Sequence, residues 1–400
     1  MNEPSFSLRK IAVAAFGPSL LFSIGQGAIL PVIALSARND GASVALAGLI
    51  VGLVGIGSLV SNIPAALLIA RYGERLAMVW AAALSVLALT LCLIPGQIAL
   101  LATGIFLVGM ATSVLLLARQ SYLIELVPLY MRARAMSTLG GMRRIGVFVG
   151  PFLGAGAMQI LGLSGAYWIA IVAMFAAGAL AYTIPDLESS GHRQTRPDGS
   201  TRILHIMHSY RKTYCTVGLG ILLVSALRAS RQIVIPLWAE HLGISPATTS
   251  VIYGIVASID MLAFYPSGKA MDQYGRLWVA VPSVLIMGAS IVLIPSTAGF
   301  VSFLVVSMVI GLGNGIGSGL VMTLGADAAP REGRTQFLGV WRLISDIGAS
   351  GAPALLSAIT AVATLAPAIV ATGMLGFVAA AVFWHWLPHA NSGQPDSSRS

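Results

Sequence analysis

Apolar runs of about 20 residues recur along almost the whole chain, and that is the length that crosses ~30 Å of hydrocarbon as a helix. Each run ends at a glycine, a proline or a charged residue. The runs are apolar on every face, whereas strands of a membrane barrel alternate with a period of two. The pattern therefore predicts twelve membrane-spanning helices, at residues 11–36, 43–70, 77–95, 98–124, 136–161, 164–185, 213–239, 246–268, 278–296, 299–325, 336–362 and 364–387.

Composition supports lipid as the solvent of this chain. Hydrophobic residues make up 57% and charged residues 9% of the sequence, against roughly 45–50% and about 25% in soluble domains. The two cysteines, Cys92 and Cys215, fall in separate predicted spans. Buried cysteine most often behaves as a small apolar side chain, so no disulfide framework is expected.

The positive charge of the chain follows its predicted topology. Of the 23 Lys and Arg residues, 16 fall in the two ends of the chain and in the even-numbered loops, one falls in the odd-numbered loops, and six lie within spans. Such asymmetry is what the positive-inside rule produces. We therefore expect a multi-pass protein of the plasma membrane with both termini cytoplasmic, and no nucleic-acid partner.

A long polar stretch divides the predicted helices six from six. It predicts an N-terminal bundle at residues 1–185, a cytoplasmic linker at 186–212, a C-terminal bundle at 213–387 and a cytoplasmic tail at 388–400. The halves also resemble each other, because an offset of 202 residues aligns three prolines and several glycines and charges: Pro64 with Pro266, Pro128 with Pro330, Pro151 with Pro353, Gly73 with Gly275, and Glu125 with Asp327. Repeated halves of this kind are typical of transporters that rock two bundles about a central site.

Two equivalent loops carry related motifs. Residues 268–276 read GKAMDQYGR. This loop resembles the GxxxDRxGRR loop of the major facilitator superfamily. The matching positions are Gly268, Asp272, Gly275 and Arg276. Residues 66–75 read ALLIARYGER. This loop keeps Arg71, Gly73 and Arg75 but has Ala70 where the superfamily usually has aspartate.

The fifth span carries a third motif of the same superfamily. Gly146, Gly150, Pro151 and Gly154 are similar to the GxxxGPxxGG element of its drug/proton antiporters. The resemblance covers essentially the whole chain. It implies an all-α membrane fold of two pseudo-symmetric six-helix bundles, a monomer without cofactors, and a role in proton coupling for Arg119, which resembles the fourth-span arginine of that group.

Charged residues inside spans are the main candidates for function, because each costs about 2.5–3.5 kcal/mol near the bilayer centre on insertion scales. Arg143 and Arg144 lie close enough to the cytoplasm to snorkel. The candidates for proton coupling are Asp260, Asp346 and Arg119, and the candidates for the substrate cavity are Gln26, Arg228, Arg231, Asn314 and Arg342. The alternative for each charged pair is a purely structural ion pair.

Counting these charges predicts the charge of the solute. Arg342 and Asp346 lie four apart and can pair along one helix face. Asp260 can neutralise one of the two seventh-span arginines, and we assign it to Arg228. Arg231 then remains for the solute, so an anionic solute is expected to be handled at least as well as a cationic one.

The glycines and the loop carboxylate have structural interpretations as well. Asp272 can act as a latch against the start of the fifth span, which carries Arg132 and Arg134, or can belong to an ordinary turn.

The tenth span has two glycine stripes, for which plain helix packing is the alternative. Gly311, Gly315 and Gly319 lie on one face, and Gly313 and Gly317 lie on another.

Together these patterns predict a secondary active transporter that exports a small organic solute in exchange for protons by alternating access. The alternatives are a proton-independent facilitator and a non-transporting membrane receptor. An enzyme is not expected, because the sequence contains neither a GxxxxGK[ST] loop nor an HExxH motif. No cofactor or metal site is predicted.

Overall fold

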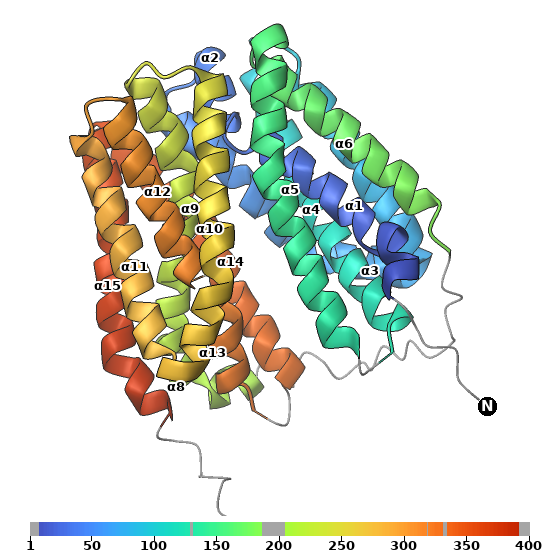
Figure 1. The fold of residues 1–400 in the computed structure, drawn as a ribbon, viewed down its shortest axis with the longest axis vertical. Coiled ribbons are helices and arrows are strands. Elements are labelled where there is room, and N and C mark those ends of the chain that lie inside the picture. The colour runs from blue at the N-terminus through green and yellow to red at the C-terminus, as the bar shows by residue number, and fades with distance from the viewer. Residues whose placement is uncertain (1–7, 129–130, 186–204, 318, 331–333, 392–400) are drawn as a thin grey trace, which may run out of the picture. The chain divides into compact units, whose positions relative to one another are not determined.

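The computed structural model describes residues 8–128, 131–185, 205–317, 319–330 and 334–391, and helix is the only regular structure in these ranges (Figure 1). Most of the predicted linker and the end of the predicted tail, residues 186–204 and 392–400, lie outside the described residues. The all-helical fold predicted from the apolar runs is confirmed.

Eleven helical stretches among the described residues are long and apolar enough to cross a membrane. One of them, α3 (Val44–Cys92), has 49 residues, and a straight helix of that length would measure about 74 Å, more than twice the hydrocarbon thickness. It is interrupted at Gly73, whose φ of 80° and ψ of 167° are not helical. The two parts of α3 are therefore separate spans, as the sequence predicts.

The first compact unit comprises residues 1–194 together with 243–254. Its helices are α1 (Leu8–Ile29), α2 (Ile33–Asn39), α3, α4 (Ile98–Leu126), α5 (Arg132–Leu161) and α6 (Ser164–Tyr182). The predicted first span is broken into α1 and α2 by a turn that contains Pro31. Proline lacks a backbone N–H and disfavours helical geometry in the residue before it, which explains the break.

The second compact unit comprises residues 195–242 together with 255–400. Its helices are α8 (Arg211–Cys215), α9 (Val217–His241), α10 (Pro246–Tyr274), α11 (Leu277–Leu293), α12 (Phe300–Gly317), α13 (Leu320–Ala328), α14 (Arg334–Val362) and α15 (Leu365–Asn391). The predicted seventh span is broken at Thr216 between α8 and α9, and the predicted tenth span contains α12 and α13, with residue 318 between them outside the described residues. The first turns of α10 belong to the first unit.

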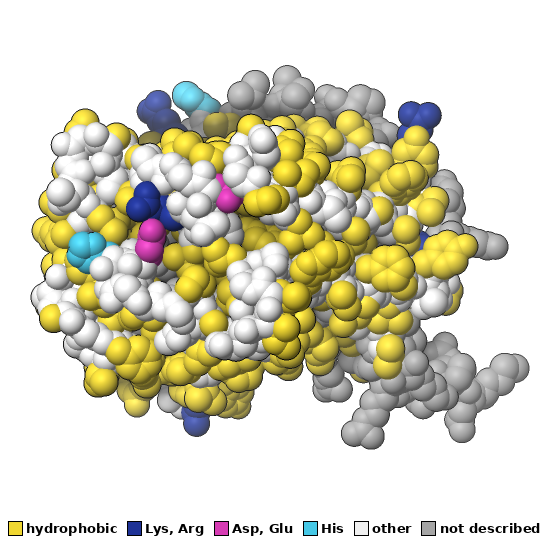
Figure 2. Space-filling view, turned by 90° about the horizontal axis from the view of Figure 1, so that it is seen from above, with side chains coloured by type: hydrophobic (Ala, Val, Ile, Leu, Met, Phe, Trp, Pro, Cys, Tyr) yellow, Lys and Arg dark blue, Asp and Glu magenta, His cyan; other side chains and the backbone are white. Residues whose placement is uncertain are grey.

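The surface is that of a membrane protein. Figure 2 shows hydrophobic side chains over much of the viewed face, with a few charged side chains among them. Large apolar and aromatic side chains are strongly exposed, among them Ile160 at 86%, Tyr265 at 81% and Val362 at 89%. Water-soluble proteins rarely expose apolar patches of this extent, whereas lipid solvates them.

Small residues let neighbouring helices approach closely within each unit. On α5, a Cβ at Gly146 would lie 2.5 Å from the Cβ of Ser23 on α1, and a Cβ at Gly154 would lie 3.3 Å from the carbonyl oxygen of Ala28. The span 5 motif is thus the face on which α5 packs against α1, a small-residue contact of the kind that drives helix association in lipid.

The two glycine stripes of α12 face two different helices. Gly311 and Gly315 lie against the backbone of α10, at Val256 and Asp260. Gly313 lies against Met287 and Ser283 of α11, and Gly317 lies against Ser283 of the same helix. These contacts favour the helix-packing interpretation of the stripes, with α12 inserted between α10 and α11.

Candidate functional site

A charged cluster lies within the helices of the C-terminal bundle. The Nη2 atom of Arg231 on α9 is 3.5 Å from the Oδ2 atom of Asp260 on α10, and both side chains are 14% exposed. Asn314 on α12 donates a hydrogen bond of 2.6 Å from its Nδ2 atom to the same oxygen. Gly315, next to Asn314, allows this approach, because a Cβ there would lie 2.6 Å from the backbone carbonyl oxygen of Asp260.

The contact of Arg231 differs from the one that charge counting assigned. The prediction gave Asp260 to Arg228 and left Arg231 for the solute, whereas Arg231 lies beside Asp260. The Nη2 atom of Arg228 donates to the carbonyl oxygen of Gly317 on α12. Spacing along α9 does not encode the contact between Arg231 and α10. The Nε atom of Arg231 is buried and has no hydrogen-bond partner among the described residues.

The N-terminal bundle carries a neutral polar cluster at the equivalent positions. Gln26 on α1 donates a hydrogen bond of 2.8 Å from Nε2 to Oγ1 of Thr112 on α4. The 202-residue offset pairs Gln26 with Arg228 and Thr112 with Asn314. Sequence reasoning proposed Gln26 and Asn314 but missed Thr112, which the same offset would have found.

Arg119 is a buried residue of the N-terminal bundle, 1% exposed. Its Nε atom donates to Oγ of Ser19 at 2.8 Å, its Nη2 atom donates to the carbonyl oxygen of Ala15, and its Nη1 atom lies 3.7 Å from the sulfur of Met78. The guanidinium therefore joins α4 to α1 and α3. These contacts give Arg119 a structural role, and its predicted part in proton coupling stays a prediction.

Arg342 and Asp346 lie on α14, with 4.0 Å between Nε and Oδ2 and side-chain exposures of 53% and 36%. The local pair expected from their spacing is therefore present. Pairs this exposed contribute about 0–1 kcal/mol to stability.

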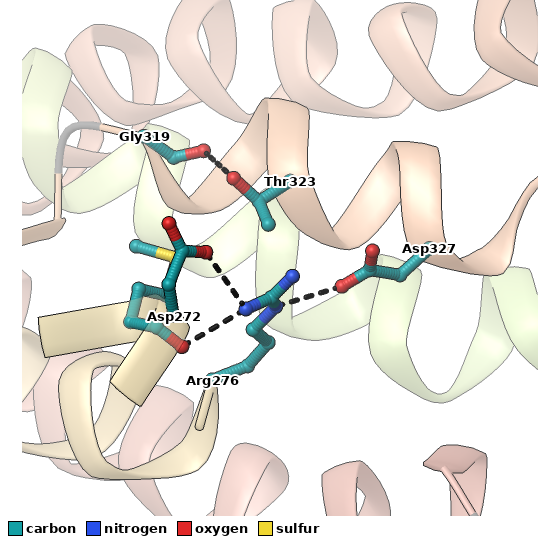
Figure 3. Close-up of polar contacts among 6 residues, drawn as sticks. Asp272, Arg276, Gly319, Thr323 and Asp327 are labelled. Atoms are coloured by element: carbon teal, nitrogen blue, oxygen red, sulfur yellow. Dashed lines mark hydrogen bonds and ion pairs between the residues drawn. The ribbon is translucent and has the colours of Figure 1, made fainter. Parts of the chain in front are cut away.

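A second charged cluster surrounds the turn between α10 and α11 (Figure 3). The Nε atom of Arg276 is 2.9 Å from Oδ2 of Asp327 on α13, and its Nη1 atom is 3.3 Å from Oδ1 of Asp272. The hydrogen bond to Asp327, followed by the charges of the two carboxylates, raises the pKa of Arg276. Gly275 provides the turn with a φ of 92°, a conformation that favours glycine.

The predicted latch of Asp272 is only partly accounted for. Asp272 contacts Arg276 of its own turn, and its side chain is 77% exposed. The side chains of Arg132 and Arg134, its predicted partners, lie outside the described residues. Latching by Asp272 against the fifth span stays a prediction.

The equivalent turn of the N-terminal bundle has the opposite charge at its key position. Gly73 adopts a φ of 80°, matching Gly275. The next residue, Glu74, occupies the place of Arg276 in the repeat, is 5% exposed and accepts a hydrogen bond of 2.8 Å from Oγ of Ser121. Sequence reasoning missed Glu74, although the 202-residue offset exposes the reversal of charge.

The flanking arginines of that turn lie over aromatic rings. The Cζ atom of Arg71 is 5.4 Å from the ring centroid of Tyr72, and that of Arg75 is 5.0 Å from the ring centroid of Tyr182 on α6. Such cation–π contacts contribute about 0.5–1 kcal/mol at exposed sites. The two predicted gating loops therefore share a backbone turn but differ in their polar contacts.

Comparison with known proteins agrees with this architecture. The family model of the Major Facilitator Superfamily matches residues 16–226 and again residues 217–400. No curated protein sequence matches the chain.

Solved transporter structures share the fold at low sequence identity. A D-xylose-proton symporter is 15% identical, with 97% of this chain and 100% of that chain covered and a TM-score of 0.74. A mutant of a nucleoside transporter is 11% identical, with 94% and 99% covered and a TM-score of 0.78. A POT family transporter in complex with 5-aminolevulinic acid is 12% identical, with 96% of each chain covered and a TM-score of 0.74. The chain is therefore a membrane transporter, not an enzyme, and belongs to the Major Facilitator Superfamily.

Proposed function

We propose that this protein is a proton-coupled secondary transporter of a small organic solute, working by alternating access. The observation that carries the proposal is the cluster of Arg231, Asp260 and Asn314 on three helices of the C-terminal bundle. Ionisable groups within membrane spans are costly and most often serve transport or proton relay. Asp260 is the carboxylate at the centre of this cluster, so it is the residue to which we assign the proton.

Proton binding at Asp260 changes its contacts with Asn314 and Arg231 in a defined way. The ionised carboxylate accepts a short hydrogen bond from Asn314 and lies beside the guanidinium of Arg231. When a proton binds, the attraction to Arg231 is lost and the guanidinium can move to another acceptor. Loss and gain of this proton on opposite sides of the membrane would couple the proton gradient to the rearrangement of α9, α10 and α12.

We propose that the solute is exported in exchange for protons and that anionic solutes are accepted. The fit of Gly146, Gly150, Pro151 and Gly154 to the antiporter element, and their role in packing α5 on α1, support exchange. The guanidinium of Arg231 supports an anionic solute, because once proton binding at Asp260 releases it, its planar fork can hold a carboxylate with two hydrogen bonds. Binding of the proton and the anion in the same state would favour symport over exchange. Symport is the second candidate, since one protein of the same fold is a D-xylose-proton symporter.

We further propose a monomer in the plasma membrane with both termini cytoplasmic. The distribution of Lys and Arg residues supports this orientation. The domain limits at residues 185, 212 and 387 belong to the same proposal.

The test uses the purified protein in liposomes that contain a pH-sensitive dye and carry an imposed pH gradient. A panel of small organic anions and cations is added, and solute-dependent proton movement is recorded in both gradient directions. Asp260→Asn should abolish solute-dependent proton movement, whereas Asp346→Asn, a matched change on α14, should leave it intact. Proton movement at the normal rate in Asp260→Asn and its loss in Asp346→Asn would transfer the coupling role to Asp346.

A further inference from the structure

The contact between Arg231 and Asp260 is longer than a pair that only stabilises the fold would be. Its N–O distance is 3.5 Å, whereas charge-assisted hydrogen bonds measure about 2.7–2.9 Å. Each side chain is only 14% exposed, so both charges have lost most of their water. A buried pair makes up for that loss only when its geometry is excellent. The long contact therefore indicates that the two groups serve something besides stability.

The N-terminal bundle shows that the fold does not need this pair. The 202-residue offset places Ile29 at the position of Arg231 and Ser58 at the position of Asp260. Ile29 is 1% exposed, so an apolar side chain fills that position in the other half of the repeat. Because the equivalent half of the fold forms without either charge, packing alone does not explain the pair in the C-terminal bundle.

Arg231 has more donors than its contact with Asp260 uses. A guanidinium carries five N–H donors in a planar fork, and the contact with Asp260 is made by Nη2. The buried Nε atom of Arg231 has no hydrogen-bond partner in the described part of the chain. Such a fork holds a carboxylate with two parallel hydrogen bonds. Arg231 is therefore suited to bind the carboxylate of a solute.

Asp260 determines what else that solute must carry. A carboxylate bound to the fork of Arg231 would lie within roughly 6 Å of Oδ2 of Asp260, a range in which like charges disfavour each other. A cation next to the carboxylate of the solute replaces this repulsion with attraction. The pair of Arg231 and Asp260 thus favours a solute that carries both charges side by side.

An α-amino acid has these charges at a suitable spacing. Standard bond lengths place its ammonium nitrogen roughly 3 Å from its carboxylate oxygens. The Nη2 atom of Arg231 and the Oδ2 atom of Asp260 are 3.5 Å apart. The ammonium can therefore face Asp260 while the carboxylate faces Arg231, and the four charged groups alternate in sign around a ring.

Asn314 holds Asp260 in place for this arrangement. Its Nδ2 atom donates at 2.6 Å to Oδ2, the oxygen that contacts Arg231. A carboxylate has about four acceptor positions on its two oxygens, so an ammonium can bind Asp260 alongside Asn314. The hydrogen bond from Asn314 keeps the carboxylate oriented when the guanidinium turns toward the solute.

We propose that the transported solute is a zwitterion whose ammonium and carboxylate are neighbours, as in an α-amino acid. Arg231 binds its carboxylate and Asp260 binds its ammonium. This inference rests on the proposed function and narrows the anionic solute to one that carries its own cation. The ammonium and the transported proton bind the same carboxylate, so they bind at different times, as exchange requires. A simple anion instead needs a proton on Asp260 and would be carried together with it.

The experiment measures binding by isothermal titration calorimetry on the full-length protein in detergent, near neutral pH and without a pH gradient. The probes are glycine, alanine, leucine, phenylalanine, glutamate and lysine. The tightest binder is compared with the acid that lacks its amino group and with the amine that lacks its carboxylate. Removal of either charge should weaken binding by at least about tenfold, because each charge makes hydrogen bonds to a charged side chain. 5-Aminopentanoate, whose charges lie farther apart, should also bind more weakly than the amino acid.

Asp260→Asn tests the assignment of the ammonium. The change removes the repulsion of a simple carboxylate, so the acid without an amino group should bind the variant roughly tenfold more tightly than it binds the unchanged protein. Damage to the fold cannot produce such a gain. Arg231→Lys keeps the charge but loses the fork, and should weaken binding of the amino acid. Asp327→Asn and Arg211→Lys, the same changes at exposed residues, should leave the binding of every probe unchanged.

The proposal is overturned if none of the amino acids binds the unchanged protein, or if the acid without an amino group binds as tightly as the amino acid. Tight binding of that acid at acidic pH alone would overturn it too, because a proton on Asp260 would then replace the cation of the solute. If Asp260→Asn cannot be purified, the comparison of analogues on the unchanged protein decides the result.

Proton movement in liposomes, recorded with the same compounds, separates this inference from the proposed function. Binding of amino acids without solute-dependent proton movement would contradict proton coupling and leave the inference intact. Proton movement with other solutes, together with a lack of amino-acid binding, would contradict the inference and leave proton coupling intact.

Discussion

Gly315→Ala on α12 is a small substitution that should damage the charged cluster from a distance. A Cβ at this position would lie 2.6 Å from the carbonyl oxygen of Asp260, 2.7 Å from Cβ of Ala263 and 2.9 Å from Cα of Asp260. Ordinary contact distances are about 3.5–4.0 Å. Two of the three atoms belong to the backbone of α10, so relief requires α12 and α10 to separate by roughly 1 Å.

That displacement has a calculable effect on the hydrogen bond between Asn314 and Asp260. The distance from Nδ2 to Oδ2 is 2.6 Å, and a shift of roughly 1 Å would stretch it to about 3.6 Å, beyond hydrogen-bonding range. Overpacking costs about 1–3 kcal/mol, and a lost hydrogen bond to a charged group costs about 1.5–3 kcal/mol. Because one movement causes both losses, they are not additive, and we expect a total of about 2–4 kcal/mol.

The assay is equilibrium unfolding of the purified protein by sodium dodecyl sulfate in mixed micelles, followed by tryptophan fluorescence. The control is Gly351→Ala on α14, where a Cβ would meet nothing within 4 Å. Alanine has the higher helix propensity, so the free energy of unfolding of Gly351→Ala should rise by between zero and about 1 kcal/mol. A neutral surface change alters the free energy of unfolding by up to about 0.5 kcal/mol. If the free energy of unfolding of Gly315→Ala differs from that of the unchanged protein by no more than this, the close approach of α12 to α10 is wrong.

Three further predictions test other parts of the molecule. In a cysteine-free background, Ser296→Cys should react with a membrane-impermeant thiol reagent in intact cells and Ser200→Cys should not, and the reverse pattern would contradict the orientation. Arg119→Lys should lower the free energy of unfolding by about 1–3 kcal/mol, because a single ammonium cannot replace the fork that reaches both α1 and α3, and equal stability by the detergent assay would refute this. Arg276→Gln should lower the free energy of unfolding by less than about 1 kcal/mol, since the pair with Asp327 is partly exposed. A larger loss of stability would show that the turn depends on this pair.

Much of the fold was predictable because the bilayer imposes a length and a polarity on every span. The limits of α4, predicted as residues 98–124 and observed as Ile98–Leu126, show how closely an apolar run matches its helix. The breaks were harder. Pro31 lies inside an apolar run that still reads as one span, as does Thr216 between α8 and α9.

The site was predictable in its members but not in its pairings. Asp260, Arg228, Arg231 and Asn314 stand out in the sequence because polar groups in lipid must find partners. The contact of Arg231 with Asp260 depends on how α9 lies against α10, which the sequence does not show. The burial of Glu74 beside Ser121 was missed for the same reason, since it depends on a contact between α3 and α4.

By itself, the sequence determined that this chain is a repeated, twelve-span membrane protein, because the cost of placing backbone and charge in lipid acts on each segment separately. It also determined the turns at Gly73 and Gly275, where the local backbone favours glycine. Only the tertiary structure decided the partners of the intramembrane charges and the contact of Trp341 with α13, because these depend on distances of a few ångströms between helices far apart in the chain.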